Sequence, residues 1–236
     1  MPDIYNPDFV TKLFDEMSDS YDRVNFLTSF GFSTRWRRQC VNKATIEPGM
    51  VVYDLMCGMG ECWHTIAANL ANEGQLIALD FSQGMVRGAE RRNQKLSGLN
   101  ITLRQQDVLS NTIADNSADC IISAFGLKTF SDEHKRLFAA EIKRILKPQG
   151  TFSLIEVSVP HYKPLRVLYM FYLKQIIPIL GKLLLGNPET YRMLGIYTEE
   201  FGNAKRMEEI LSNEGLVVNY HDFFYGCASG LSGVKV

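Results

Sequence analysis

Short apolar segments alternate with helical stretches from residue 51 onward, and this alternation constrains the fold more than any other feature of the chain. The apolar segments are "VVYDLM" (51–56), "QLIALD" (75–80), "ITLRQQD" (101–107), "ADCIISAF" (118–125) and "GTFSLIEVSV" (150–159). Helices are expected to begin near Cys62, Gln83 and Asp132. Such alternation predicts the Rossmann-like α/β class, a mostly parallel, doubly wound sheet with helices on both faces.

The regions on either side of this core divide one predicted domain into four parts. Helical periodicity predicts an N-terminal helical cap over 1–47, followed by the α/β core over 48–159. An apolar helical lid is expected over 160–202, and a helix with a late strand at 216–224 over 203–236. The glycine- and serine-rich end "YGCASGLSGVKV" (225–236) makes a poor strand, so an edge strand or a loosely held tail is expected there.

Composition excludes some classes of protein and leaves an ordinary globular one. Apolar residues make up 46% of the chain and charged residues 22%, and the net charge of −1 gives no reason to expect a nucleic-acid partner. The five cysteines lack metal-type pairing, which predicts buried, reduced thiols. The acidic N-terminus has no apolar stretch typical of a signal peptide, so we expect a cytoplasmic protein.

A glycine pair follows the first apolar segment in "VVYDLMCGMGE" (51–61). Asp54 stands near the end of the strand, and Gly58 and Gly60 follow it one residue apart. Glycines at such a turn permit positive φ and let a ligand approach the main chain. Ligands of open parallel sheets bind beyond the carboxyl ends of the strands. Because position 63 is Trp instead of a third glycine, the pair alone is a weak signal.

Two further acidic residues end the next two strands. Asp80 comes twenty residues after Gly60, where a carboxylate can accept hydrogen bonds from both hydroxyls of a ribose. Asp107 follows the third strand and could accept one from an adenine amino group. Three acidic strand ends with a glycine pair fit S-adenosylmethionine (SAM) better than NAD. The alternative is that the three aspartates are only helix-capping or turn residues.

Several segments together resemble the UbiE/COQ5 family of methyltransferases. They are "SDSYDRVNFLTSFGFSTRWRR" (18–38), the glycine motif, "ALDFSQGM" (78–85), "SADCIISAFGLKTFSDEHKRLFAAEIKRILKPQG" (117–150), "LIEVSVP" (154–160) and "TYRML" (190–194). The likeness runs from about residue 9 to 224. It implies a class I enzyme that transfers a methyl group from SAM, leaving S-adenosylhomocysteine, to a ring carbon of a quinone precursor.

The resemblance also implies which residues contact the cofactor. Asp54, Gly58 and Gly60 would hold its methionine end, Asp80 the ribose, and Asp107 with Val108 the adenine. Met85 would pack on the adenine ring, and Tyr21 would close over the cofactor. The full expected set is Tyr21, Asp54, Gly58, Gly60, Asp80, Phe81, Met85, Asp107, Val108 and Ala124.

The region after the fourth strand departs from the family pattern. The family's Gly-Leu-Arg-Asn is here Gly126-Leu127-Lys128-Thr129, which replaces a planar guanidinium by a point charge. Methylation of an aromatic carbon requires deprotonation of a neighbouring hydroxyl and a cation beside the resulting phenolate.

The expected catalytic set is therefore Lys128 as cation, Glu156 or His161 as base, and Tyr191 and Arg192 as substrate-orienting residues. Glu156 could instead be a paired core carboxylate, and His161 an exposed loop residue.

The stretch "PLRVLYMFYLKQIIPILGKLLLG" (164–186) is apolar but not a membrane span. Arg166, Lys174 and Lys182 are evenly spaced along it, and Pro178 interrupts it. A lid helix pair over the substrate pocket and an amphipathic element at a membrane surface are both compatible with this pattern. The arginines of "RWRR" (35–38) are expected on a solvated helix face.

Three functions therefore stand against one another. The first is a SAM-dependent methyltransferase that acts on a lipophilic or aromatic small molecule, in its sharpest form at a carbon of a quinone precursor. The second is an N- or O-methyltransferase of a lipid headgroup or secondary metabolite. The third is a non-catalytic SAM- or S-adenosylhomocysteine-binding protein that acts through partners. Peripheral membrane contact through 164–186 and a homodimer are left open, and no metal is expected.

Overall fold

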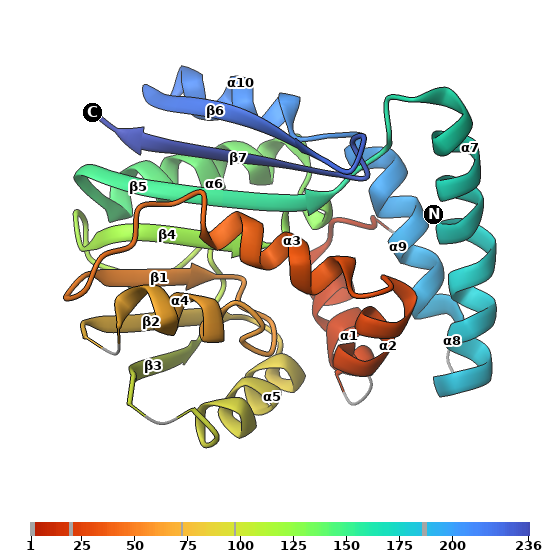
Figure 1. The fold of residues 1–236 in the computed structure, drawn as a ribbon, viewed down its shortest axis with the longest axis horizontal. Helices are drawn as coiled ribbons and strands as arrows, with labels where there is room; N and C mark the ends of the chain where they lie inside the picture. Colours follow the sequence, from red (N-terminus) through yellow and green to blue (C-terminus); the bar gives the residue numbers. More distant parts are fainter. Residues whose placement is uncertain (1–2, 19–20, 72, 97, 186–187) are drawn as a thin grey trace.

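One seven-stranded sheet forms the centre of the molecule, with the strand order β3-β2-β1-β4-β5-β7-β6 (Figure 1). The computed structural model describes residues 3–18, 21–71, 73–96, 98–185 and 188–236, with the backbone alone for 21–24, 183–185 and 188–190. Strands β1 to β5 are parallel, and β7 is antiparallel to both neighbours. The strands are β1 (Val51–Leu55), β2 (Gln75–Asp80), β3 (Asn100–Gln105), β4 (Ala118–Ala124), β5 (Leu146–Val157), β6 (Leu216–Phe223) and β7 (Ala228–Lys235). The predicted α/β class is confirmed.

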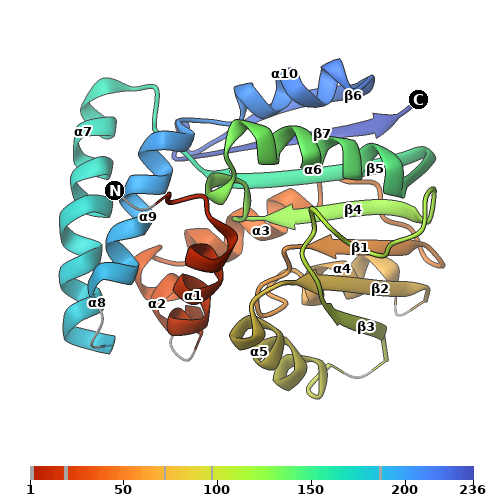
Figure 2. The ribbon, with the colours of Figure 1, turned by 180° about the vertical axis from the view of Figure 1, so that it is seen from behind.

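Helices cover both faces of the sheet, as Figures 1 and 2 show from opposite sides. Helices α3 (Phe32–Val41), α4 (Trp63–Leu70) and α5 (Gln83–Asn93) pack on one face, and α6 (Asp132–Ile145) and α10 (Lys205–Asn213) on the other. Alternation along the strands explains the two layers, since Val52 and Tyr53 of β1 belong to different apolar clusters. Both clusters are fully buried at their centres, for example at Trp63 and Phe138.

A helical cap lies beyond the carboxyl ends of the parallel strands (Figure 1). From here on, the helical cap includes helices from both predicted segments, the N-terminal cap and the apolar lid. Its members are α1 (Pro7–Met17), α2 (Tyr21–Thr28), α7 (Lys163–Phe171), the π-helical turn η2 (Tyr172–Ile176), α8 (Ile177–Leu185) and α9 (Pro188–Phe201). The N-terminal helices and the apolar segment near 160–200, which are far apart in the sequence, therefore share one end of the molecule. The short 3-10 helix η1 (Leu127–Thr129) faces this cap.

Pro178 does not end the apolar helix, although the sequence suggested an interruption there. Proline lacks an N–H group and its ring clashes with the carbonyl four residues earlier, here that of Lys174. The chain widens into the π-helical turn η2 at that point and continues directly into α8. Among the described residues, no helix has both the length and the apolar character needed to cross a membrane.

The C-terminal strand β7 is an interior strand of the sheet, so the expectation of an edge strand or a loose tail was wrong. It pairs with β5 and β6 on its two sides, and β6 forms the edge. The glycines that suggested a weak strand are required by packing. A Cβ at Gly233 would lie 2.0 Å from the Val217 carbonyl oxygen and 2.6 Å from the Phe152 ring. The five cysteines are buried free thiols, as predicted.

Replacement of Gly233 by alanine should destabilise the protein, because no side chain fits between Phe152 and the backbone of β6. We expect Gly233→Ala to lower the free energy of unfolding by about 1–3 kcal/mol, the usual cost of overpacking. Urea denaturation monitored by circular dichroism measures this. Val236→Ala, next to the strand with a side chain 77% exposed, is the control and should change nothing measurable. Equal stabilities of the two variants would contradict the packing argument.

Candidate active site

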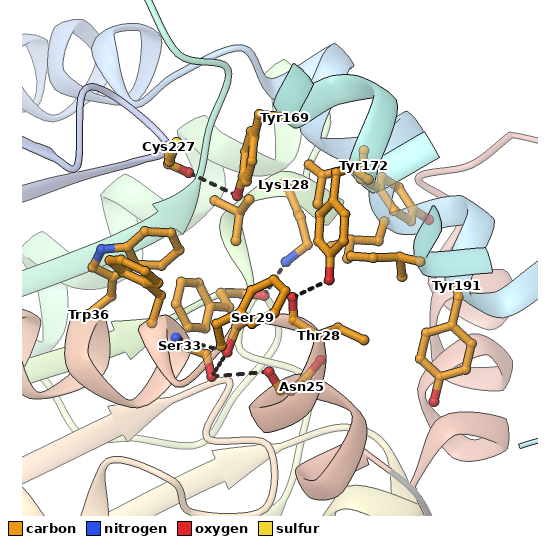
Figure 3. A pocket seen from close by; sticks show the side chains of 18 of the residues that line it. Asn25, Thr28, Ser29, Ser33, Trp36, Lys128, Tyr169, Tyr172, Tyr191 and Cys227 are labelled. Atoms are coloured by element: carbon orange, nitrogen blue, oxygen red, sulfur yellow. Dashed lines mark hydrogen bonds between the residues drawn. The ribbon is translucent and has the colours of Figure 1, made fainter. Parts of the chain in front are cut away.

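Two adjoining cavities lie between the carboxyl ends of the strands and the helical cap. The larger has a volume of about 350 Å³ and is shown in Figure 3. The smaller has a volume of about 40 Å³ and lies over the ends of β1, β2 and β4. Phe14, Arg37, Phe125 and Thr129 line both cavities and therefore mark the joint between them.

The smaller cavity brings together much of the predicted cofactor set. Its lining includes Asp54, Gly58, Asp80, Phe81, Met85 and Ala124, together with Glu61. At the edge of this cavity the chain turns sharply at Met56, after β1, and at Phe125, after β4, where φ is +57° and +69°. A left-handed conformation is uncommon for residues of this size, and such outliers concentrate at functional sites.

The Asp80 carboxylate joins the glycine turn to the start of α5. Its Oδ2 accepts a hydrogen bond from the Gly58 N–H at 2.8 Å, and its Oδ1 accepts one from the Ser82 N–H at 3.0 Å. Ser82 caps α5 by accepting from the Met85 N–H at 3.1 Å. Its hydroxyl also donates to Asp15 of α1 at 2.6 Å, and the Gly84 N–H donates to the same carboxylate at 2.8 Å. Asp80 thus organises the loop, and α1 is fastened onto it.

The two glycines of the opening motif have different roles. Gly58, at φ +56°, lines the cavity, and a Cβ there would lie 3.0 Å from a Glu61 carboxylate oxygen. Gly60, at φ +81°, does not line the cavity. It faces the Trp63 ring instead, since a Cβ at Gly60 would lie 2.5 Å from that ring. Trp63 in turn donates its indole N–H to Asp54 Oδ2 at 3.0 Å. Gly60 is therefore placed to position Trp63 and, through it, Asp54.

Burial makes the two aspartates of this cavity weak acids. Asp54 is 1% exposed, and burial, with the nearby Glu61 carboxylate, raises its pKa to about 8. Burial likewise raises the pKa of Asp80 to about 7, against the opposing effect of the hydrogen bonds from Ser82 and Gly58. A bound cation or hydroxyl donors would favour the ionised form of both carboxyl groups.

Three members of the predicted cofactor set do not line either cavity among the described side chains. Gly60 is one of them. Asp107 is half-buried and accepts from the Leu109 N–H at 2.9 Å, which is the turn-residue alternative. Val108 is buried in the apolar cluster under α6. Asp107 still lies beside Asp80, because the Gln106 N–H donates to the Asp80 carbonyl oxygen at 3.0 Å. The Tyr21 side chain lies outside the described residues.

Apolar and aromatic side chains form most of the wall of the larger cavity. Trp36, Tyr169, Tyr172 and Tyr191 are among them, and Figure 3 shows them around the Lys128 side chain. Tyr172 donates its hydroxyl to the Thr28 carbonyl oxygen at 2.8 Å, which ties the π-helical turn to the end of α2. The segment from the end of α2 into α3 adds a polar pair to the lining, the hydroxyls of Ser29 and Ser33 at 2.8 Å (Figure 3).

Lys128 and Glu156 form a buried ion pair at the base of the larger cavity. The Lys128 ammonium lies 2.9 Å from Glu156 Oε1 and donates to the Phe125 carbonyl oxygen at 2.8 Å. Glu156 accepts two more hydrogen bonds, from the backbone N–H groups of Lys128 at 3.0 Å and Val157 at 2.7 Å. Glu156 is fully buried and does not line the cavity, so it is the paired core carboxylate that the sequence left as an alternative.

The other expected catalytic residues are not all near this pair. Tyr191 is buried and lines the larger cavity. His161 and Arg192 are exposed and line neither cavity. His161 follows β5 but lies against Gly226, so its exposed-loop alternative matches its position.

Arg37 corrects the expectation of a solvated "RWRR" face. Arg35 and Arg38 are exposed, but Arg37 is 7% exposed and lines both cavities. The helical period contains the signal, because Ser33, Trp36, Arg37, Cys40 and Val41 form the buried stripe of α3. Arg37 therefore lies on the inner face of the helix.

The lining of the smaller cavity matches the polar groups of SAM, and because its volume is only about 40 Å³ the lining side chains must move apart when SAM binds. Asp80 and Asp54 offer buried carboxylate oxygens for hydroxyl and cationic groups, and Gly58 leaves the backbone open. Phe81 and Met85 offer apolar surfaces for a base. When bound, SAM supplies an electrophilic methyl group on a sulfonium centre. The acidic wall would hold that centre, and Arg37 and Phe125 mark the side that faces the larger cavity.

SAM binding should release protons near pH 7, because Asp54 and Asp80 have pKa values of about 8 and about 7 in the ligand-free protein. The cation favours the ionised carboxylates, so the affinity for SAM should rise with pH from about 6 to 8. Calorimetric titration in buffers of different ionisation enthalpy measures the release. Asp54→Asn, which retains an acceptor for Trp63, should reduce it, and uptake of protons by the native protein would contradict the assignment.

Comparison with known proteins places the chain in a family. The model of the ubiE/COQ5 methyltransferase family matches residues 3–235. The demethylmenaquinone methyltransferase of Geobacillus kaustophilus (strain HTA426) is 31% identical over 228 residues, which cover 96% of each chain. That of Desulfitobacterium hafniense (strain Y51) is 29% identical over 232 residues, covering 96% of this chain and 90% of the relative.

Solved structures show the same fold. A SAM-dependent methyltransferase from Aquifex aeolicus is similar with a TM-score of 0.60 and 20% identity, over 85% of this chain and 89% of that one. Phosphoethanolamine N-methyltransferase 2 from Haemonchus contortus, in complex with SAM, has a TM-score of 0.59 and 15% identity, over 93% and 60% of the two chains. With the family match over nearly the whole chain, the conclusion is plain: this chain belongs to the ubiE/COQ5 methyltransferase family, and it is a SAM-dependent methyltransferase.

Proposed function

We propose that the protein methylates a ring carbon of a demethylated, isoprenoid naphthoquinone in its reduced, hydroquinone form. One observation carries the proposal: an aromatic-walled cavity of about 350 Å³ opens directly onto the acidic cavity that suits SAM. A volume near the lower end of the range for small-molecule pockets suits a fused ring rather than a macromolecule. The two relatives named demethylmenaquinone methyltransferase support this choice of acceptor.

The redox form of the acceptor follows from the direction of electron flow. Transfer forms a bond between the ring carbon and the methyl carbon, and the electron pair of the broken carbon–sulfur bond stays on sulfur. The ring must therefore supply an electron pair, which an electron-poor quinone does not do and an ionised hydroquinone does. Loss of the hydroxyl proton before transfer and of the ring proton after it restores the aromatic ring.

Lys128 is the residue we assign to a ring oxygen of the acceptor. An ammonium has three N–H donors, and those to Phe125 and Glu156 account for two of them in the described part of the chain. A third can reach the cavity that Lys128 lines. Glu156 is better suited to position this ammonium than to remove a proton, because both its oxygens already accept hydrogen bonds. The hydroxyls of Ser29 and Ser33 add a polar pair to the lining of the same cavity.

Incubation with SAM and a chemically reduced demethylmenaquinone should give a product heavier by one methylene unit that has lost its ring hydrogen. Mass spectrometry and proton NMR distinguish this product from an ether or an amine. Asp80→Asn should raise the KM for SAM by at least tenfold, because the loop contacts of its carboxylate are weakened. Methylation of an oxygen, or of phosphoethanolamine in preference to the quinol, would count against the proposal.

We also propose that the mouth of the larger cavity rests on a lipid surface. Ten of the thirteen large apolar side chains that are exposed in the described part of the chain lie in segments 26–30, 162–179 and 224–225. We call these segments the apolar rim. Ring contacts join it to the cavity wall, at 6.0 Å between Phe30 and Tyr172 and at 4.7 Å between Phe32 and Phe224.

A lipid occupant fits this rim better than a second protein surface. The cavity can hold a ring but not an extended isoprenoid tail, so the tail must leave through the mouth that the rim surrounds. Exposed cations at Lys163, Arg166 and Lys182 border the rim, as in helices that lie at anionic lipid surfaces. The α7–η2–α8 segment would then act as both a lid and a surface anchor.

Removal of two rim side chains should weaken vesicle binding. Phe30 and Phe171 are 79% and 58% exposed, and burial of one such side chain contributes about 1.5–3 kcal/mol, so the double variant Phe30→Ser/Phe171→Ser should bind about a hundredfold or more weakly. Co-sedimentation with phosphatidylcholine–phosphatidylglycerol vesicles measures this, and Val217→Ser on the edge strand β6 is the control. An unchanged partition, or a dimer in ultracentrifugation that the double variant abolishes, would overturn the lipid assignment.

A further inference from the structure

One charged side chain lies at the joint of the two cavities among the described residues. Of the four residues that line both cavities, Phe14, Phe125 and Thr129 are neutral and Arg37 is the cation. A methyl donor in the smaller cavity and an acceptor ring in the larger one must meet at this joint. Arg37 is therefore the cation placed beside the reacting carbon.

We propose that Arg37 is a catalytic residue that binds the acceptor's ring oxygen next to the methylated carbon and stabilises its anionic form. The inference rests on the proposed function, since it requires an acceptor with an ionisable ring hydroxyl. It extends the assignment of Lys128, because Arg37 and Lys128 both lie beside the ring of Phe125, which lines the joint of the two cavities. The Arg37 guanidinium carbon is 4.6 Å from the centre of the Phe125 ring, and the Lys128 ammonium is 6.0 Å from it.

The guanidinium of Arg37 is held in a fixed position before any ligand binds. Nη2 lies 3.3 Å from Glu61 Oε1, and the planar group stacks on Phe125. Glu61 is itself held, since its Oε2 accepts from the Met59 N–H at 3.0 Å. A long side chain fixed in this way loses little conformational entropy when an oxygen anion binds. Because Arg37 is 7% exposed, its charge is poorly screened by water.

Two anions compete for Arg37, the acceptor's ring oxygen and the α-carboxylate of SAM, and the place of Arg37 at the joint of the two cavities favours the ring oxygen. The smaller cavity is lined by Asp54, Glu61 and Asp80, which suit the sulfonium and ammonium groups of SAM. The larger cavity receives the group that becomes negative, and Lys128 and Arg37 are the basic residues of its lining among the side chains that the structure describes. A hydroquinone carries two oxygens on opposite sides of the ring, so two separate cations match its charge distribution.

The step in which Arg37 acts is balanced without any further reactant. The acceptor's hydroxyl loses its proton to solvent, and Arg37 binds the resulting oxygen anion. The ring carbon next to that oxygen forms its bond to the methyl carbon while the carbon–sulfur bond breaks, which leaves a neutral ring ketone and a neutral thioether. Loss of the ring proton then returns the negative charge to the oxygen beside Arg37.

Arg37→Gln should reduce kcat with a hydroquinone acceptor by about 10²–10³-fold, the usual cost of removing one preorganised donor to an oxyanion. The KM for SAM should change by less than a factor of about three. Arg37→Lys should retain part of the activity, because charge remains but the planar fork is lost. The exposed neighbour Arg38→Gln should match the native enzyme. Acceptors with electron-withdrawing ring substituents, which ionise more readily, should partly rescue Arg37→Gln.

A binding measurement without turnover separates this role from a structural one. A chromophoric naphthol should bind to the native protein with its hydroxyl pKa lowered, seen as naphtholate absorption at a lower pH than in solution. Arg37→Gln should abolish this shift while circular dichroism and the melting temperature report an intact fold. If the glutamine variant does not fold, the same titration on Arg37→Lys, with a smaller shift expected, decides the question.

Three results would overturn the assignment. One is an unchanged naphthol pKa in folded Arg37→Gln, another is a loss confined to SAM affinity, and the third is equal kcat in Arg37→Gln and Arg38→Gln. Failure of the broader proposal looks different. If no quinol is methylated but the native protein still lowers the naphthol pKa through Arg37, the oxyanion site stands and the acceptor assignment falls.

Discussion

The structure of the smaller cavity depends on one buried carboxylate, that of Asp80 at the end of β2. Its two oxygens accept from the Gly58 and Ser82 backbones, so it holds the turn after β1 against the start of α5. Ser82 passes the connection to Asp15, which fastens α1 over the same loop. A buried carboxylate is costly to leave unpaired, so this arrangement is specified strongly. The same carboxylate that organises the loop also lines the cavity.

Local patterns predicted the elements of the core because strand and helix periods are read from neighbouring residues. The second strand, 75–80, agrees with the structure because its apolar run marks it. The helix starts at Gln83 and Asp132 also agree, because a serine caps each helix at the preceding residue. The strand β7 could not be predicted in this way. Its glycines have low strand propensity and so predict a weak strand. In the structure Gly233 leaves room for the Phe152 ring and the β6 backbone, which are distant in the sequence.

The same limit separates the predictable and unpredictable parts of the site. Asp54 and Asp80 lie at the ends of β1 and β2, and Gly58 follows β1, so the topology alone places them at one edge. Glu156 lies near the end of β5 and Lys128 in η1 after the adjacent strand β4, but only packing decides that they pair. Arg37 was missed because its charge suggested solvent, although the stripe from Ser33 to Val41 places it inside. A charged residue within a buried helical stripe is therefore better interpreted as a candidate site residue than as a solvated one.

The smaller cavity carries carboxylates and the larger one carries two cations within an apolar wall, and the charge change of the proposed reaction explains this combination. The proposed methyl-transfer step brings a sulfonium and an oxygen anion together and leaves a neutral ring ketone and a neutral thioether, so this step consumes charge. Water stabilises separated charges more than the transition state that joins them, and a dry cavity removes this advantage. Without carboxylate partners, Arg37 and Lys128 would bind the acceptor's oxygen anion so tightly that the barrier to methyl transfer would rise. Because Glu61 and Glu156 already share them, the two cations permit ionisation of the acceptor without trapping the product of that ionisation.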